Sequence, residues 1–142
     1  MIVADTGAIV ALIDRSDRHH DALMALYEDD PSMWVLPWAI LPEVDYLVGK
    51  YLGPPAQEAF LADLADGIFR VEWGREADLE RAKALARQYR ALNLGLVDGT
   101  VIAVAERLKA DAIATLDVRH FGAVSIKGRP ALLPRDNQRF LR

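Results

Sequence analysis

The sequence alternates short apolar runs with longer segments in which apolar residues recur at helical spacing. The short runs predict strands at residues 2–4, 33–36, 69–73, 112–115 and 131–133. The longer segments predict helices at residues 6–13, 19–27, 40–52, 56–65, 76–92 and 96–108. Short strands that alternate with helices are typical of right-handed βαβ units, whose parallel sheet is covered on both faces. The pattern therefore predicts an α/β fold with a parallel sheet.

Length and composition narrow the class of protein further. A chain of 142 residues is the size of one domain, so we expect a single domain over residues 1–142. The chain has no cysteine, which excludes disulfides, thiolate metal sites and cysteine nucleophiles. A formal net charge of −4 argues against a uniformly basic nucleic-acid binder, although a local basic patch remains open.

We do not expect the apolar N-terminal segment to be a membrane anchor. Residues 2–13 are interrupted by Asp5 and are far shorter than the ~20 residues of a membrane span. The segment also has no basic start and no small-residue cleavage site. We therefore expect a cytoplasmic protein with no membrane association.

Acidic residues stand at unusual places in this pattern. Asp5 and Asp117 each follow a predicted strand, whereas Glu43 and Asp98 each lie in the first turn of a predicted helix. Taken singly, each has an ordinary interpretation as a helix cap, a favourable charge at a helix N-terminus or a turn residue. In a parallel sheet, however, the carboxyl ends of the strands and the starts of the following helices share one edge. We therefore expect these side chains to converge.

Converging carboxylates have consequences for the chemistry of that edge. They repel one another and become protonated unless a cation lies among them. Oxygen ligands without cysteine or paired histidine suit Mg²⁺ or Mn²⁺ better than Zn²⁺ or Cu²⁺. Such an ion polarises a phosphate oxygen and activates water, so the site predicts phosphoryl chemistry.

Four segments of the chain carry a family resemblance. They are VADTGAIVAL at residues 3–12, LPEV at 41–44, LVDGTVIA at 96–103 and ATLDVRHF at 114–121. Together and in this order they resemble the PIN-domain ribonucleases, and among these the VapC-like toxins of toxin–antitoxin pairs. The resemblance implies one PIN-like domain, with a doubly wound central parallel sheet of about four to five strands flanked by helices. It also implies Mg²⁺- or Mn²⁺-dependent endonucleolytic cleavage of RNA, whether tRNA, rRNA or mRNA.

The resemblance assigns roles residue by residue. The positions that match the family's acidic quartet are Asp5, Glu43, Asp98 and Asp117. It implies that Asp5, Asp98 and Asp117 hold the metal directly or through water. Glu43 would orient or deprotonate the attacking water, or hold a second metal. Thr6 and Thr115 match hydroxyl positions that help to order the catalytic site.

The resemblance also implies partners and shows one departure. The family's toxins bind an antitoxin whose C-terminal segment enters a groove, and they often form homodimers. Gly99 stands where the family more often has alanine, and because it lies in the first turn of its helix we expect little effect.

The C-terminal segment differs in charge from the rest of the chain. Residues 118–142 contain one acid, Asp136, and six basic residues: Arg119, Lys127, Arg129, Arg135, Arg139 and Arg142. The segment is a candidate for contact with backbone phosphates, and a solvated tail is the alternative interpretation. Arg119, two residues after Asp117, is the first candidate near the scissile phosphate.

Histidine and aromatic residues receive weaker assignments. We expect His19 and His20 on the surface at a helix start, because their spacing is not that of metal ligands, and His120 to be structural. A group of apolar residues could form a groove that marks a partner surface where it is exposed: Trp34, Trp38, Tyr46, Tyr51 and Leu52.

Other functions remain open from the sequence. The stretch from Val97 to Thr100 superficially resembles the signature of haloacid-dehalogenase-like phosphatases, but position 96 is leucine and the motif opens a late helix. A metal-dependent phosphatase or phosphotransfer protein is therefore one alternative. A non-enzymatic regulator that keeps the acids only to bind metal is another. A third is a PIN-type RNA-processing nuclease outside a toxin system.

Overall fold

The centre of the molecule is a sheet of five parallel strands. The computed structural model describes residues 1–137. The strands are β1 (Ile2–Ala4), β2 (Trp34–Pro37), β3 (Arg70–Glu72), β4 (Ala112–Ala114) and β5 (Ala131–Leu133). Their order across the sheet is β3-β2-β1-β4-β5, and every neighbouring pair is parallel.

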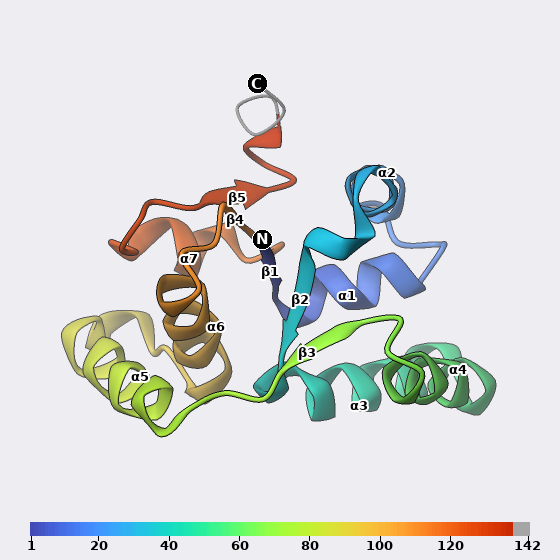
Figure 1. Cartoon of the computed structure of the whole chain (residues 1–142), viewed down its shortest axis with the longest axis horizontal. Coiled ribbons are helices and arrows are strands. Elements are labelled where there is room, and N and C mark those ends of the chain that lie inside the picture. Colours follow the sequence, from blue (N-terminus) through green and yellow to red (C-terminus); the bar gives the residue numbers. More distant parts are fainter. Residues whose placement is uncertain (138–142) are drawn as a thin grey trace.

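Helices cover both faces of the sheet. They are α1 (Thr6–Ile13), α2 (His20–Asp29), α3 (Leu41–Leu52), α4 (Pro54–Ala65), α5 (Glu76–Gln88), α6 (Leu96–Arg107) and α7 (Val118–Ala123). Figure 1 shows α1 to α4 on one side of the strands and α5 to α7 on the other. The chain winds outward from β1 in one direction and from β4 in the other, so right-handed crossovers place the helices on opposite faces. The doubly wound α/β fold that the sequence predicts is confirmed.

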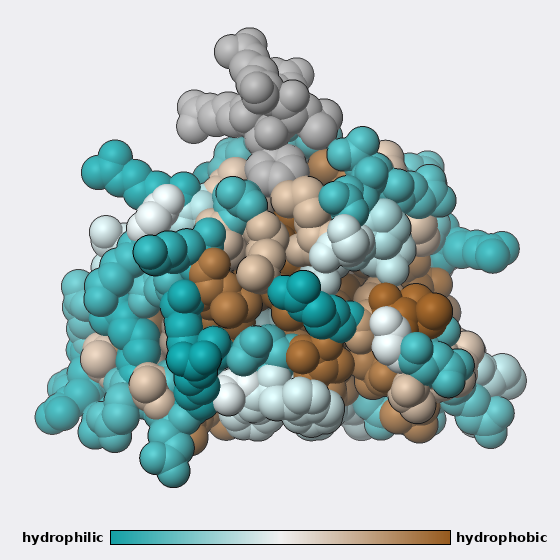
Figure 2. Space-filling model, in the orientation of Figure 1, coloured by the Kyte–Doolittle hydropathy of each residue, from teal (hydrophilic) through white to brown (hydrophobic). Residues whose placement is uncertain are grey.

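The inner strands and α6 form the core. All residues of β1, β2 and β4 are buried, as continuous apolar strands of a two-sided sheet should be. In α6 every residue from Gly99 to Ala105 is buried. The outer side of α5 is polar, and Figure 2 shows hydrophilic side chains over it.

A close helix contact sets the position of α6. A Cβ atom added to Gly99 would lie 2.9 Å from the Cβ of Ala82 on α5 and 3.1 Å from its Cα. The glycine therefore allows the two helices to approach closely. The sequence-based expectation that Gly99 matters little considered helix propensity alone and did not include this contact.

Some element boundaries differ from the predicted ones. The helix predicted over residues 76–92 ends at Gln88 and is followed by a 3-10 turn, Arg90–Leu92, after which Asn93 adopts a left-handed conformation. The short helix α7 is not predicted at all, because six residues are too few to show a helical period. No helix in the described part of the chain is long and apolar enough to cross a membrane.

Candidate active site

Asp5 lies at the carboxyl end of β1, where the chain turns into α1. Its backbone N–H donates to the carbonyl of Ala114 on β4, at 2.8 Å. One carboxylate oxygen accepts the Thr6 N–H at 2.8 Å, so Asp5 is indeed the helix cap that its position allows. The other oxygen accepts the Thr115 hydroxyl at 2.9 Å, and the residue is only 7% exposed. Asp5 is therefore held rigidly through both carboxylate oxygens.

Thr115 connects the ends of the two central strands. Its side chain is fully buried just after β4. Its hydroxyl donates to Asp5 and accepts the backbone N–H of Asp117 at 3.0 Å. One hydroxyl group thus fixes the position of Asp117 relative to Asp5.

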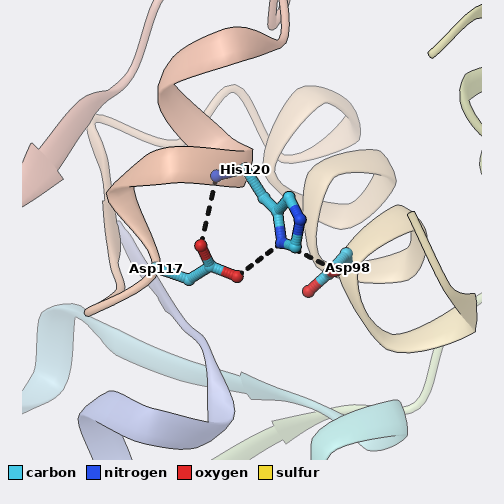
Figure 3. Close-up of side chains that lie close together, drawn as sticks. All are labelled: Asp98, Asp117 and His120. Carbon is cyan, nitrogen blue, oxygen red and sulfur yellow. Dashed lines mark hydrogen bonds and ion pairs between the residues drawn. The ribbon is translucent and has the colours of Figure 1, made fainter. Parts of the chain in front are cut away.

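Asp98, Asp117 and His120 form a compact group (Figure 3). The imidazole of His120 lies between the two carboxylates, with Nδ1 at 2.7 Å from Oδ2 of Asp117 and 3.9 Å from Oδ2 of Asp98. Asp117 also caps α7, because its Oδ1 accepts the backbone N–H of His120 at 3.1 Å. One ligand atom from each of the three residues lies within 4.8 Å of the others, a spacing that could hold a metal ion.

The expectation that His120 is merely structural therefore misses its place in the site. The signal in the sequence was its spacing of three residues from Asp117, which puts two side chains on one face of a helix. That signal could be used only if α7 itself had been predicted.

The four predicted acids line one open pocket of about 470 Å³. Its lining residues are Asp5, Thr6, Gly7, Glu43, Leu47, Asp98, Leu116 and Asp117. Glu43 is exposed in the first turn of α3, while Asp98 is half-buried in the first turn of α6. The hydroxyl of Thr6 is buried at the pocket and has no hydrogen-bond partner within residues 1–137. Unlike Thr115, Thr6 holds Asp5 through its backbone and not through its hydroxyl.

The electrostatics of the pocket favour a bound cation. Burial raises the pKa of Asp5 to about 6, although the Thr6 and Thr115 hydrogen bonds oppose the rise, and the charges of Asp98 and Glu43 add to it. Burial and the charge of Asp117 likewise raise the pKa of Asp98, with His120 partly opposing them. The ionised forms of these carboxylates are thus unfavourable unless a cation is bound among them. The donors fit a hard divalent ion, because carboxylate oxygens predominate among them.

The other predicted residues lie around this site or away from it. Arg119 is exposed on α7, two residues after Asp117. Arg129 and Arg135 line a separate hollow beside α7, and Arg135 pairs with Asp136. Arg139 and Arg142 lie outside the described residues.

The histidines and aromatic residues divide between surface and core. The ring of His20 lies 2.8 Å from the carbonyl of Ala11, which gives it a local structural contact. Trp34 is only 2% exposed and belongs to the core, so it takes no part in a surface groove. Tyr46 and Tyr51 are 62% and 64% exposed on α3 and remain available to a partner.

Comparison with known proteins identifies the family. The model of the PIN domain family matches residues 2–127. The chain belongs to the PIN domain family, which confirms the resemblance seen in the sequence. A curated relative, Ribonuclease VapC26 of Mycobacterium tuberculosis, is 29% identical over 123 residues, which cover 87% of this chain and 91% of the relative.

Solved structures show the same fold. VapC20 of Mycobacterium tuberculosis, a toxin that cleaves the sarcin–ricin loop, has a TM-score of 0.75 at 23% identity, with 89% of this chain and 98% of that chain covered. A toxin–antitoxin complex from Klebsiella pneumoniae has a TM-score of 0.67 at 21% identity, with 94% and 96% covered.

Proposed function

We propose that this protein is a metal-dependent endoribonuclease and the toxin of a toxin–antitoxin pair. The observation that carries the proposal is the pocket at the carboxyl edge of the sheet, which Asp5, Glu43, Asp98 and Asp117 line together. Membership of the PIN domain family and similarity to a relative named as a ribonuclease support it.

In this proposal the acids hold an Mg²⁺ or Mn²⁺ ion. Asp98 and Asp117 offer carboxylate oxygens within 4.8 Å of each other, and Asp5 contributes directly or through a water molecule. The bound ion would polarise a phosphate oxygen, lower the pKa of the attacking water and neutralise the leaving oxygen. His120 keeps Asp117 oriented, because its ring N–H can donate to a carboxylate that only accepts.

Glu43 and Thr115 have supporting roles in the same proposal. Glu43 lies exposed at the pocket, where it can orient the attacking water and take its proton, or help to hold a second ion. Thr115 fixes the orientation of Asp5 and the position of Asp117 through its hydroxyl. Arg119, exposed on α7, is placed to contact an RNA phosphate next to the pocket.

The proposed partner is a cognate antitoxin. Two similar solved structures support this partner. One is a toxin–antitoxin complex from Klebsiella pneumoniae, and the other is VapBC2 from Rickettsia felis. The exposed Tyr46 and Tyr51 on α3 are apolar surface suited to a protein partner, either the antitoxin or a second copy of the chain. We propose both a cognate antitoxin and a homodimer.

The first test compares the wild type with Asp98→Asn on total bacterial RNA, in Mg²⁺, in Mn²⁺ and in EDTA. We expect discrete RNA fragments only from the wild type and only with metal, because the variant removes a charge that holds the ion. Growth arrest on expression of the wild type, relieved by Asp98→Asn, tests the toxin role. Cleavage by a folded Asp98→Asn at the wild-type rate would contradict the site.

The same experiment separates the alternatives. A wild type that hydrolyses a small phosphate ester but leaves RNA intact would be a phosphatase. A wild type that binds Mn²⁺ in a calorimetric titration yet turns over neither substrate would be a binding protein. Cleavage without growth arrest would leave the nuclease and overturn the toxin role.

A further inference from the structure

Trp73 is an exposed tryptophan at the same edge of the sheet as the acidic pocket. Among residues 1–137 it is the most exposed large apolar side chain, at 74%. It directly follows Glu72, the last residue of β3, which pairs with Pro37, the last residue of β2. Because Val3 pairs with Val35, Asp5 lies level with Pro37. Two strand spacings, roughly 10 Å, therefore separate Glu72 from Asp5 along this edge.

The backbone on both sides of Trp73 is held by a partly buried charge network. Arg107, at the end of α6, donates to Glu72 at 2.8 Å and to both oxygens of Asp78 at 2.8 and 2.9 Å. Asp78 is buried, whereas the side chains of Arg107 and Glu72 are partly exposed. Asp78 also accepts the backbone N–H of Arg75 at 2.9 Å. The network thus ties the loop that carries Trp73 to α6, whose first turn carries Asp98.

Gly74 completes this support. Its backbone N–H donates to Glu72 at 3.2 Å, and its φ is +86°, a conformation that favours glycine. A Cβ atom there would lie 2.5 Å from the indole nitrogen of Trp38, so the loop packs directly on that ring. The structure therefore fixes the backbone around an indole ring that packs against little of the protein itself.

We propose that Trp73 stacks on an unpaired base of the RNA whose phosphate enters the acidic pocket. This inference rests on the proposed nuclease function and adds to it a residue that holds the RNA next to the pocket. An aromatic side chain presented on a rigid support is the usual means of holding an unpaired base, and it tolerates any sequence. The protein carries a net charge of −4, so general attraction for phosphates is weak and a stacking contact gains importance.

The test measures binding apart from cleavage. The probes are 12-nucleotide oligouridylate and oligoadenylate, titrated in EDTA against the wild type, Trp73→Ala, Trp73→Phe and Ile68→Ala. Ile68 is the matched control, because it is 59% exposed and lies before the amino end of β3, whereas Trp73 follows the carboxyl end of that strand. We expect Trp73→Ala to weaken binding roughly 5- to 100-fold, Trp73→Phe to keep most of the affinity and Ile68→Ala to change it less than about twofold.

Two further readouts distinguish stacking from other roles. Both dissociation constants should increase as the salt concentration rises. The ratio of the Trp73→Ala constant to the wild-type constant should stay the same, because stacking releases no counterions. In metal, Trp73→Ala should raise KM on single-stranded RNA and leave kcat within about twofold. Because Trp73 is exposed, the variants should keep the wild-type Tm.

The outcomes separate this proposal from the proposed function. A wild type that cleaves RNA, with equal binding by Trp73→Ala, would overturn the stacking role and leave the nuclease intact. Weakened binding by Trp73→Ala together with no cleavage by the wild type would support stacking and overturn the nuclease. Equal RNA binding with a changed oligomeric state in sedimentation would make Trp73 a protein contact. A wild type that binds neither oligonucleotide in EDTA would overturn the stacking role, while the nuclease would still be tested by cleavage in the presence of metal.

Discussion

At the scale of single residues, one hydroxyl group organises the acidic pocket. Thr115 is buried after β4 and forms a hydrogen bond to Asp5 with its proton and to the N–H of Asp117 with its oxygen. Each carboxylate reaches the pocket from a different strand end, so neither strand alone could set the distance between them. We therefore expect this small buried side chain to affect the proposed catalysis without touching the substrate.

Thr115→Val tests this role, because valine has nearly the shape of threonine and lacks the hydroxyl. We expect the variant to lose about 1–3 kcal/mol of unfolding free energy, since a buried carboxylate oxygen and an N–H are left without their partner. We also expect kcat to fall more than KM rises. Denaturant unfolding and steady-state cleavage measure the two effects. Thr115→Ser keeps the hydroxyl and serves as the control, and equal behaviour of all three proteins would contradict the role.

At the scale of secondary structure, the sequence predicts the fully buried elements better than the exposed ones. The strands β1, β2 and β4 are continuous apolar runs and α6 is a longer apolar segment, so their predicted bounds lie close to the observed ones. Helix α7 spans six residues and shows no period, and with it His120 is lost from the predicted site. Trp73 appears in the sequence as the last residue of a predicted strand, whereas the observed strand β3 ends at Glu72 and leaves it in an exposed loop.

Tertiary contacts account for the other differences. Helix propensity alone treats Gly99 as a minor weakness of α6, but its role is to admit Ala82 of α5. Likewise, the convergence of the acids at the strand ends could be predicted, because parallel strands end at one edge of the sheet. The charge network of Arg107, Asp78 and Glu72 could not, because it joins residues that no local sequence pattern connects. Contacts between elements are therefore the part of this fold that a single sequence does not predict.

Gly99→Ala tests the helix contact. We expect it to destabilise the protein by about 1–3 kcal/mol, in spite of the better helix propensity of alanine, because the added methyl group overlaps the Ala82 side chain and backbone. The change in Tm measures the effect. Gly95→Ala, at the start of the same helix with no neighbour within 4 Å, is the control and should shift Tm less. A Tm of Gly99→Ala at or above that of the wild type would contradict this argument, because it would show that α5 and α6 can move apart without loss of stability.

At the scale of the whole molecule, the acidic pocket makes stability depend on pH and on metal. The folded pKa of Asp5, about 6, lies above its ordinary value of 3.8. The folded protein therefore binds this proton more tightly than the unfolded chain does. In the absence of metal, its contribution to stability is present at pH below 4 and is lost as pH rises through about 6.

Asp5→Asn isolates this contribution. In EDTA at pH 7 we expect the variant to be more stable than the wild type by up to about 3 kcal/mol, since it removes the buried charge. At pH 4 most of the difference should be gone, because the folded-state carboxyl is then protonated and the unfolded-state carboxyl is close to its ordinary pKa of 3.8. Adding Mg²⁺ or Mn²⁺ should raise the wild-type Tm and leave that of Asp5→Asn nearly unchanged. A stability difference that does not vary between pH 4 and pH 7 would contradict the burial argument.

The hydrogen bond between Thr115 and Asp5 spans 110 residues of chain. During synthesis the N-terminal half, with Asp5 and Glu43, leaves the ribosome long before β4 and Asp117 exist to complete the pocket. The central strand β1 likewise cannot pair with β4, its neighbour on one side, until β4 has been synthesised. The acidic pocket is therefore incomplete until synthesis has passed Asp117, and the N-terminal half on its own lacks two of the four carboxylates that line it.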